Sequence, residues 1–300
     1  MSNQIDTALV YGFRKAVELQ YQQMGSVLRP HVRFETQNSE KEFYDRIGPT
    51  TAVRNTSRHG DTPLIETPHD RRMVTLVDYD WADLIDNKDK LRMLLDPTSA
   101  YAQNAGFAIG RALDQTIIDA AFGTAYAGKE GTTPVSFDSN FVVASTYMGN
   151  GVTPAANNLN VAKLRRARKL IQSANAWPKG SKGVCVITAS QLESLLEQTP
   201  VTSSDYNSVK ALVSGDVNTF LGFEFVMLED MLPHDSGTDI TSCLCYVPNG
   251  LLGAAAEELK IRITERADKR YSVQVYAAGT FGASRMWEAQ TVKVECDNSP

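Results

Sequence analysis

The sequence predicts an α+β fold in which one long helix lies among many short strands. A helical pattern extends from Pro97 to Phe122, whereas helices of globular proteins average about 11–12 residues. A markedly polar stretch, residues 31–72, precedes the first clear strand. From Glu258 to Cys296 the chain has the alternating pattern of successive strands.

The composition is that of a soluble globular protein. Hydrophobic residues make up 42% and charged residues 22% of the 300 positions, and the net charge is -5. A protein whose main task is to bind nucleic acid needs an excess of Lys and Arg on one face, so this charge argues against that class. No apolar run approaches the roughly 20 residues of a membrane span, and the first residues lack a signal-peptide profile. We expect a protein made in a cytoplasm, with no membrane partner.

The four cysteines predict no disulfide framework, because none belongs to a C-x-x-C pair and a chain of this length does not need disulfide bonds to be stable. We expect reduced, partly buried thiols. These residues are Cys185, Cys243, Cys245 and Cys296.

The N-terminal residues follow the pattern of an amphipathic helix. Apolar side chains recur at steps of four and three from Ile5 to Leu28, and Arg29 and Pro30 end the pattern. It is either the first helix of a core or an arm whose apolar face docks on a neighbouring subunit. The pattern alone favours the core helix.

The stretch 31–72 has too few apolar residues to fold on its own. Only 9 of its 42 positions are hydrophobic, so burial cannot offset the entropy of ordering it. We expect an extended loop ordered by other subunits, or else a solvated flexible loop. Its charges have both signs, so copies of one surface could pair with each other. The candidate inter-subunit residues are Arg33, Glu40, Glu42, Arg46, Arg54, Arg58, Asp61, Arg71 and Arg72.

The next segments predict a strand and the long helix. Residues 73–81 alternate with a period of two, and a short helix is expected at 88–95. Asp96 is a good N-cap, Pro97 suits the first helical position, and Gly123 ends the helix. The helix would be roughly 39 Å long. Its many Ala and Gly residues would let other backbones lie close to it.

Residues 125–158 are rich in Gly, Thr, Ser, Pro and Asn and predict a loop with one short strand at 141–143. A basic amphipathic helix, 159–171, follows. Its polar face is either solvated, which we favour, in contact with another subunit, or in non-specific contact with nucleic-acid phosphates. The basic residues are Lys163, Arg165, Arg166, Arg168 and Lys169.

The remaining chain predicts strands and helices in turn. The helix is expected at 190–197, and strands at 183–188, 220–228, 243–247 and through 258–296. No repeat of fixed period appears.

Motifs of catalysis and cofactor binding are missing. The sequence contains no G-x-S-x-G elbow, no phosphate-binding glycine loop, no H-E-x-x-H and no paired C-x-x-C. We therefore expect no enzyme activity, no cofactor and no metal.

Three local stretches and their order carry a resemblance to a known family. They are D-N-K-D-K at 86–90 leading into L-D-P at 95–97, V-S-G-D at 213–216 followed by F-L-G-F-E-F at 220–225, and R-A-D-K-R-Y at 266–271 followed by G-A-S-R at 282–285. In this layout the chain resembles the major capsid proteins of tailed bacteriophages, which share the Hong Kong 97-type capsid fold.

The resemblance implies a division of the chain into parts. These are an N-terminal arm (1–30), an extended β-hairpin loop (31–80), a peripheral domain (81–180) with a spine helix (97–122), an axial domain (181–257), and strands that return through both domains (258–300).

The resemblance also implies a function. The subunit would self-assemble into pentamers and hexamers of an icosahedral phage head around double-stranded DNA, which it would contact without sequence specificity. Because no long scaffolding extension precedes the arm, we expect a separate scaffolding protein, a portal and, as a further option, a decoration or cement protein. The location would be the virion, after assembly in the host cytoplasm. The alternatives are an encapsulin-like compartment shell and, from another class, a soluble α/β enzyme or binding protein.

Overall fold

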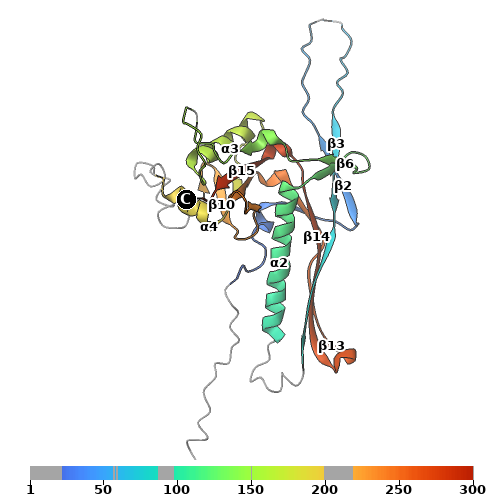
Figure 1. The fold of residues 1–300 in the computed structure, drawn as a ribbon. Helices are drawn as coiled ribbons and strands as arrows, with labels where there is room; N and C mark the ends of the chain where they lie inside the picture. Colours follow the sequence, from blue (N-terminus) through green and yellow to red (C-terminus); the bar gives the residue numbers. More distant parts are fainter. Residues whose placement is uncertain are drawn as a thin grey trace, which may run out of the picture. The chain divides into compact units, whose positions relative to one another are not determined.

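The computed structural model describes residues 22–56, 58, 60–86, 98–149, 151–198 and 219–299 (Figure 1). The chain divides into two compact units. Unit 1 consists of Met1–Ser26, Asp78–Ala112 and Glu257–Gly279, and unit 2 of Val27–Val77, Leu113–Ala256 and Thr280–Pro300.

A seven-stranded sheet forms the main core of unit 2. Its order is β7-β15-β12-β8-β10-β9, and β11 pairs with β12. All five residues of β8 are buried. The bounds are β7 Val142–Val143, β8 Gly183–Ile187, β9 Thr219–Phe220, β10 Phe223–Met227, β11 His234–Asp235, β12 Ile240–Tyr246 and β15 Thr291–Asp297.

Two short helices belong to the same unit, and each is capped by its own sequence. Asn160 accepts a hydrogen bond from the backbone N–H of Lys163 and begins α3 (Val161–Ser173). Thr188 and Gln191 form a capping box at the start of α4 (Ala189–Leu196). The short 3-10 helices of the described chain are η2 Arg29–His31, η3 Ser139–Phe141, η4 Pro248–Gly250, η5 Ala267–Lys269 and η6 Glu288–Gln290.

A second sheet of unit 2 has the order β2-β3-β5-β6. Its first two strands form an antiparallel hairpin in which Lys41 pairs with Thr75 and Ile47 with His69. The connection, residues 48–68, has no regular structure where it is described and extends well beyond the paired strands (Figure 1). We call it the hairpin loop. The bounds are β2 Lys41–Ile47, β3 His69–Thr75, β5 Ala125–Ala127 and β6 Thr133–Val135.

The third sheet has the order β1-β13-β14-β4, and the boundary between the units falls within it and within α2 (Thr98–Phe122). Within unit 1, a Cβ added to Gly110 of α2 would lie 2.5 Å from the backbone of Gly25. The small residues of this helix therefore admit a neighbouring backbone, as expected. The bounds are β1 Arg33–Thr36, β4 Val77–Ile85, β13 Leu251–Arg266 and β14 Ser272–Arg285.

The predicted positions of several helices and strands are confirmed. The long helix ends at Phe122, the basic helix forms α3, and β8, α4, β10, β12 and the three last strands lie where strands and helix were expected. All four cysteines are buried and free. In the described chain, no helix is long and apolar enough to cross a membrane.

Other predictions are wrong. Residues 22–28 form no helix, and the strand expected at 73–81 is interrupted at Leu76. The stretch expected to be mostly loop, 125–158, also contains β5 and β6. They form because β5 pairs with β3, and β6 pairs with β5. Pairing with a distant strand overrides the weak local preference there. Residues 1–21, the helix expected at 88–95, and Asp96 and Pro97 lie outside the described residues.

Gly282 is required where β14 passes the junction of β3 and β4. An added Cβ would lie 2.2 Å from the carbonyl oxygen of Thr75 and 3.4 Å from Cα of Leu76. We expect Gly282→Ala to lower the free energy of unfolding by about 1–3 kcal/mol, the usual cost of overpacking. Urea unfolding followed by tryptophan fluorescence measures this loss. Gly180→Ala is the control for steric overlap, since no atom lies within 4 Å of its added Cβ. Its positive φ gives this control a backbone strain energy but no steric clash.

Candidate functional site

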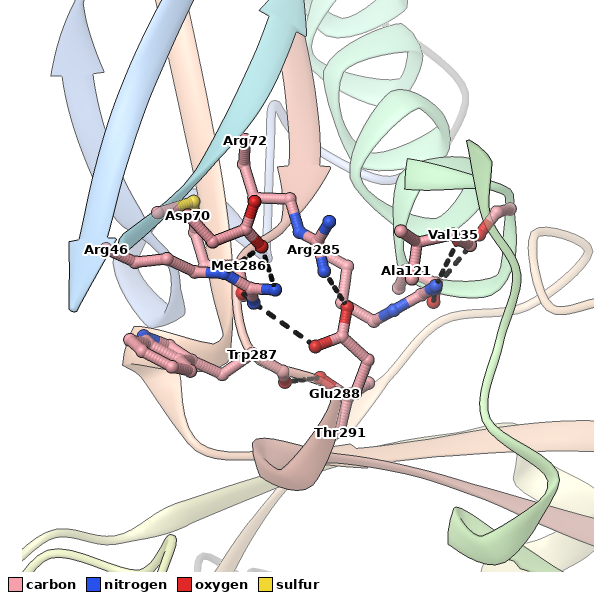
Figure 2. Close-up of polar contacts among 11 residues, drawn as sticks. Arg46, Asp70, Arg72, Ala121, Val135, Arg285, Met286, Trp287, Glu288 and Thr291 are labelled. Atoms are coloured by element: carbon pink, nitrogen blue, oxygen red, sulfur yellow. Dashed lines mark hydrogen bonds and ion pairs between the residues drawn. The ribbon is translucent and has the colours of Figure 1, made fainter. Parts of the chain in front are cut away.

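The base of the β2–β3 hairpin is held by a network of ionic contacts within unit 2 (Figure 2). The guanidinium of Arg46 donates two hydrogen bonds to Oδ2 of Asp70, at 3.0 and 2.6 Å. It also donates to the carbonyl of Met286 and, at 3.2 Å, to Oε2 of Glu288, and it lies over the ring of Trp287. One arginine of the hairpin therefore ties both of its strands to the end of β14.

Glu288 is the carboxylate that bridges the two hairpin arginines. Its Oε2 accepts from Arg46 and its Oε1 from Nη2 of Arg72. The Arg72 side chain is only 1% exposed, and its Nε and Nη1 have no hydrogen-bond partner among the described residues. Burial lowers the pKa of Arg72, and the charge of Glu288 opposes this shift. The buried guanidinium thus depends on Glu288.

A third arginine, Arg285, binds the C-terminal end of α2. It donates to the carbonyls of Ala121 at 2.7 Å and Gly123 at 2.9 Å, and to that of Val135 at 3.1 Å. The last carbonyls of a helix have no partner within the helix, and a cation there is favoured by the helix dipole. Arg285 therefore joins α2, β6 and β14, next to the base of the hairpin (Figure 2).

The hairpin loop carries charged and apolar side chains that its own unit does not cover. Its described residues 49–56, 58 and 60–68 are all exposed. Leu64 is 97% exposed and Val53 59%. Within the described part of the chain, no carboxylate pairs with Arg54 or Arg58. The exposed Val53 and Leu64 make this loop a candidate for contact with another molecule.

The structure separates the nine candidate loop residues into two groups. Arg46 and Arg72 belong to the hairpin base, where burial and carboxylate partners commit them to the subunit's own fold. We leave them out of the proposed contact surface. Arg33 pairs with Glu35 on exposed β1, and Arg71 pairs with Asp45 across the hairpin at 3.1 Å. Glu40, Arg54, Arg58 and Asp61 are exposed, and Glu42 is half-buried.

The basic helix α3 is divided in the same way. Lys163 is fully buried, and its Nζ donates to the carbonyls of Asn157, Asn158 and Glu295. Arg168 donates to the carbonyl of Leu221 at 2.8 Å and stacks on Trp177. Neither side chain can face DNA or another subunit without breaking these contacts, so we leave both out of that surface.

The other three basic residues of α3 lie together. Arg165, Arg166 and Lys169 line a hollow of about 320 Å³, with Tyr147, Gly149 and Ala162 as the other described lining residues. We call it the cationic hollow. Of the basic residues expected to contact DNA or a subunit, these three remain available.

Sequence reasoning missed Glu288, Asp70 and Tyr147 as partners of these arginines. Glu288 lies 216 positions from Arg72 and 242 from Arg46, so no local spacing connects them. In the described chain, no group of three His, Cys, Asp or Glu side chains is placed to hold a metal ion.

A family model described as "Phage capsid protein" matches residues 5–298. The chain belongs to the phage capsid protein family. No curated protein sequence matches this phage capsid protein.

Solved structures share the fold of the phage capsid protein at low sequence identity. The capsid of Cyanophage P-SCSP1u has a TM-score of 0.71 at 13% identity, with 100% of this chain and 96% of that chain covered. The capsid of Cyanophage Pam1 has a TM-score of 0.71 at 13% identity, covering 97% of each chain. The head of Helicobacter pylori bacteriophage KHP40 gives 0.70 at 10% identity, covering 99% of each.

These matches confirm the α+β fold of the Hong Kong 97 type and the family expected from the sequence. The phage capsid protein is a structural protein of a phage shell, and the alternative of an encapsulin-like compartment is not favoured. The division into arm, extended loop, peripheral and axial domains stays a prediction.

Proposed function

We propose that the phage capsid protein forms the pentamers and hexamers of an icosahedral head that encloses double-stranded DNA, and that its function is assembly and not catalysis. The observation that carries this proposal is the family match over residues 5–298, together with a hairpin loop that its own unit leaves uncovered. A separate scaffolding protein, a portal and a decoration or cement protein are proposed partners. Assembly would take place in the host cytoplasm.

The hairpin loop supplies the contact between subunits in this proposal. At its base, Arg46, Arg72 and Glu288 connect both strands to the end of β14. Its far part, residues 48–68, exposes Arg54, Arg58, Asp61 and Leu64. The described part of the chain does not cover these side chains, so another molecule can bury the apolar ones and pair the charged ones. In a closed shell each subunit repeats this contact, so weak contacts add up to a stable particle.

The test is negative-stain electron microscopy of the purified protein, with light scattering on the same sample. Closed shells, tubes or capsomer rings, formed alone or with a candidate scaffolding protein, are the expected result. A uniform monomer under both conditions would overturn the proposal. Shells that co-purify with a protein cargo and never occur in a phage particle would instead support the encapsulin-like alternative.

A further inference from the structure

The cationic hollow concentrates positive charge on a chain that is otherwise negative. Arg165 and Lys169 are exposed and one turn apart on α3, about 6 Å along the helix axis. Arg166 lies between them, with its guanidinium 5.9 Å from the ring centre of Tyr147. Among the described residues that line the hollow, three are cations and none is a carboxylate. The net charge of the chain is -5, so this local excess of cations is opposite in sign to the charge of the whole chain.

The three cations are also available to a ligand. In the described part of the chain, no carboxylate forms an ion pair with Arg165, Arg166 or Lys169. By contrast, Lys163 and Arg168 on the same helix donate hydrogen bonds to backbone carbonyls. The helix therefore uses two of its basic residues to fold and leaves three around one hollow.

We propose that the cationic hollow binds phosphodiester groups of the DNA enclosed by the shell, through Arg165, Arg166 and Lys169. This inference rests on the proposed function. A guanidinium binds phosphate oxygens in a bidentate geometry, and an ammonium binds them as a point charge. Arg165 and Lys169 lie one helical turn apart, so both side chains can contact phosphates of one strand.

The lining of the hollow favours a phosphate backbone over an acidic peptide. Besides the cations it offers Gly149, Ala162 and the ring of Tyr147, which Arg166 covers. An acidic peptide that docks through apolar anchor side chains would need pockets for them, and the described lining residues form none. Contacts through phosphate oxygens carry no sequence information, so the hollow binds DNA of any sequence.

The direct test measures DNA binding by fluorescence anisotropy, with a labelled duplex of about 20 base pairs at several salt concentrations. The variant is Arg165→Gln/Arg166→Gln/Lys169→Gln. Each phosphate contact contributes about 0.9 to the slope of log affinity against log salt, so we expect the slope to fall by about 2–3 and the affinity at 0.1 M salt on the order of 100-fold. The control is Lys179→Gln, an exposed lysine outside the hollow, which should leave both unchanged.

Two further measurements keep the inference separate from its alternatives. Lys169→Glu, a single exposed change, should weaken DNA binding even if the triple variant fails to fold. Polyglutamate replaces DNA in a parallel titration; if only polyglutamate binding depends on the three cations, the hollow serves an acidic protein and the inference is overturned. Unchanged DNA binding in both variants overturns it too. If the wild-type protein forms shells but its DNA affinity does not depend on the three basic residues, only this inference is overturned. If the wild-type protein forms no shells, the proposed function itself is contradicted.

Discussion

Glu288→Gln is expected to lower the free energy of unfolding of the phage capsid protein by about 3 kcal/mol, since removing one partner of a buried ion pair costs about 3–5 kcal/mol. The low end applies because the Glu288 side chain is 21% exposed. The substitution preserves shape but removes the charge that both Arg46 and Arg72 contact. Arg46 keeps its ion pair with Asp70, whereas in the described structure Arg72 forms an ion pair with no carboxylate other than Glu288. The buried guanidinium of Arg72 therefore causes most of the loss.

Urea unfolding of the unassembled subunit measures this effect, with Glu35→Gln as the matched control. The Arg33–Glu35 pair is exposed, with 52% and 35% of the two side chains accessible, so its loss should cost less than about 1 kcal/mol. Adding Arg72→Met to Glu288→Gln should recover part of the stability, because the buried charge is then gone. Equal losses for Glu288→Gln and Glu35→Gln would show that the network does not stabilise the hairpin base.

The sequence could predict the elements whose signals are local. The long helix follows from an unbroken helical pattern that ends at Gly123, and α3 from an apolar stripe opposite basic residues. The buried strand β8 follows from its continuous apolar run. Each of these signals lies within the element it predicts, so tertiary contacts were not needed to find it.

The sequence could not show which charges are buried. Arg54 and Arg72 look alike in a stretch of mixed charge, yet the first is exposed in the loop and the second is buried. What separates them is Glu288, which the fold brings to Arg72 from the other end of the chain. Lys163 is a similar case, because the carbonyl of Glu295 that binds it lies 132 positions away. Charge patterning identifies a candidate surface, but only the fold shows which residues reach it.

Charge reversal in the hairpin loop, Arg54→Glu/Arg58→Glu, is expected to abolish shell formation and leave the subunit folded. Both side chains are exposed, so the change should alter the free energy of unfolding by no more than about 0.5 kcal/mol. In an assembled shell every copy would carry the two introduced carboxylates. Where loops of neighbouring copies meet, these carboxylates would face the acidic Asp61 and Glu66, and the repulsion between like charges would oppose association. Light scattering and electron microscopy measure assembly, and circular dichroism measures folding.

A charge-swapped variant distinguishes ion pairing between copies from a simple loss of surface charge. Adding Asp61→Arg and Glu66→Arg reverses all four loop charges, so loops that pair with each other regain complementary partners. Assembly should then return at least in part. If the loop instead contacts a different surface of the neighbouring subunit, the swapped loop stays mismatched and no shells form. Normal shells from Arg54→Glu/Arg58→Glu would contradict any role of these arginines in assembly, and the exposed Val53 and Leu64 would then be the remaining basis for a contact by this loop.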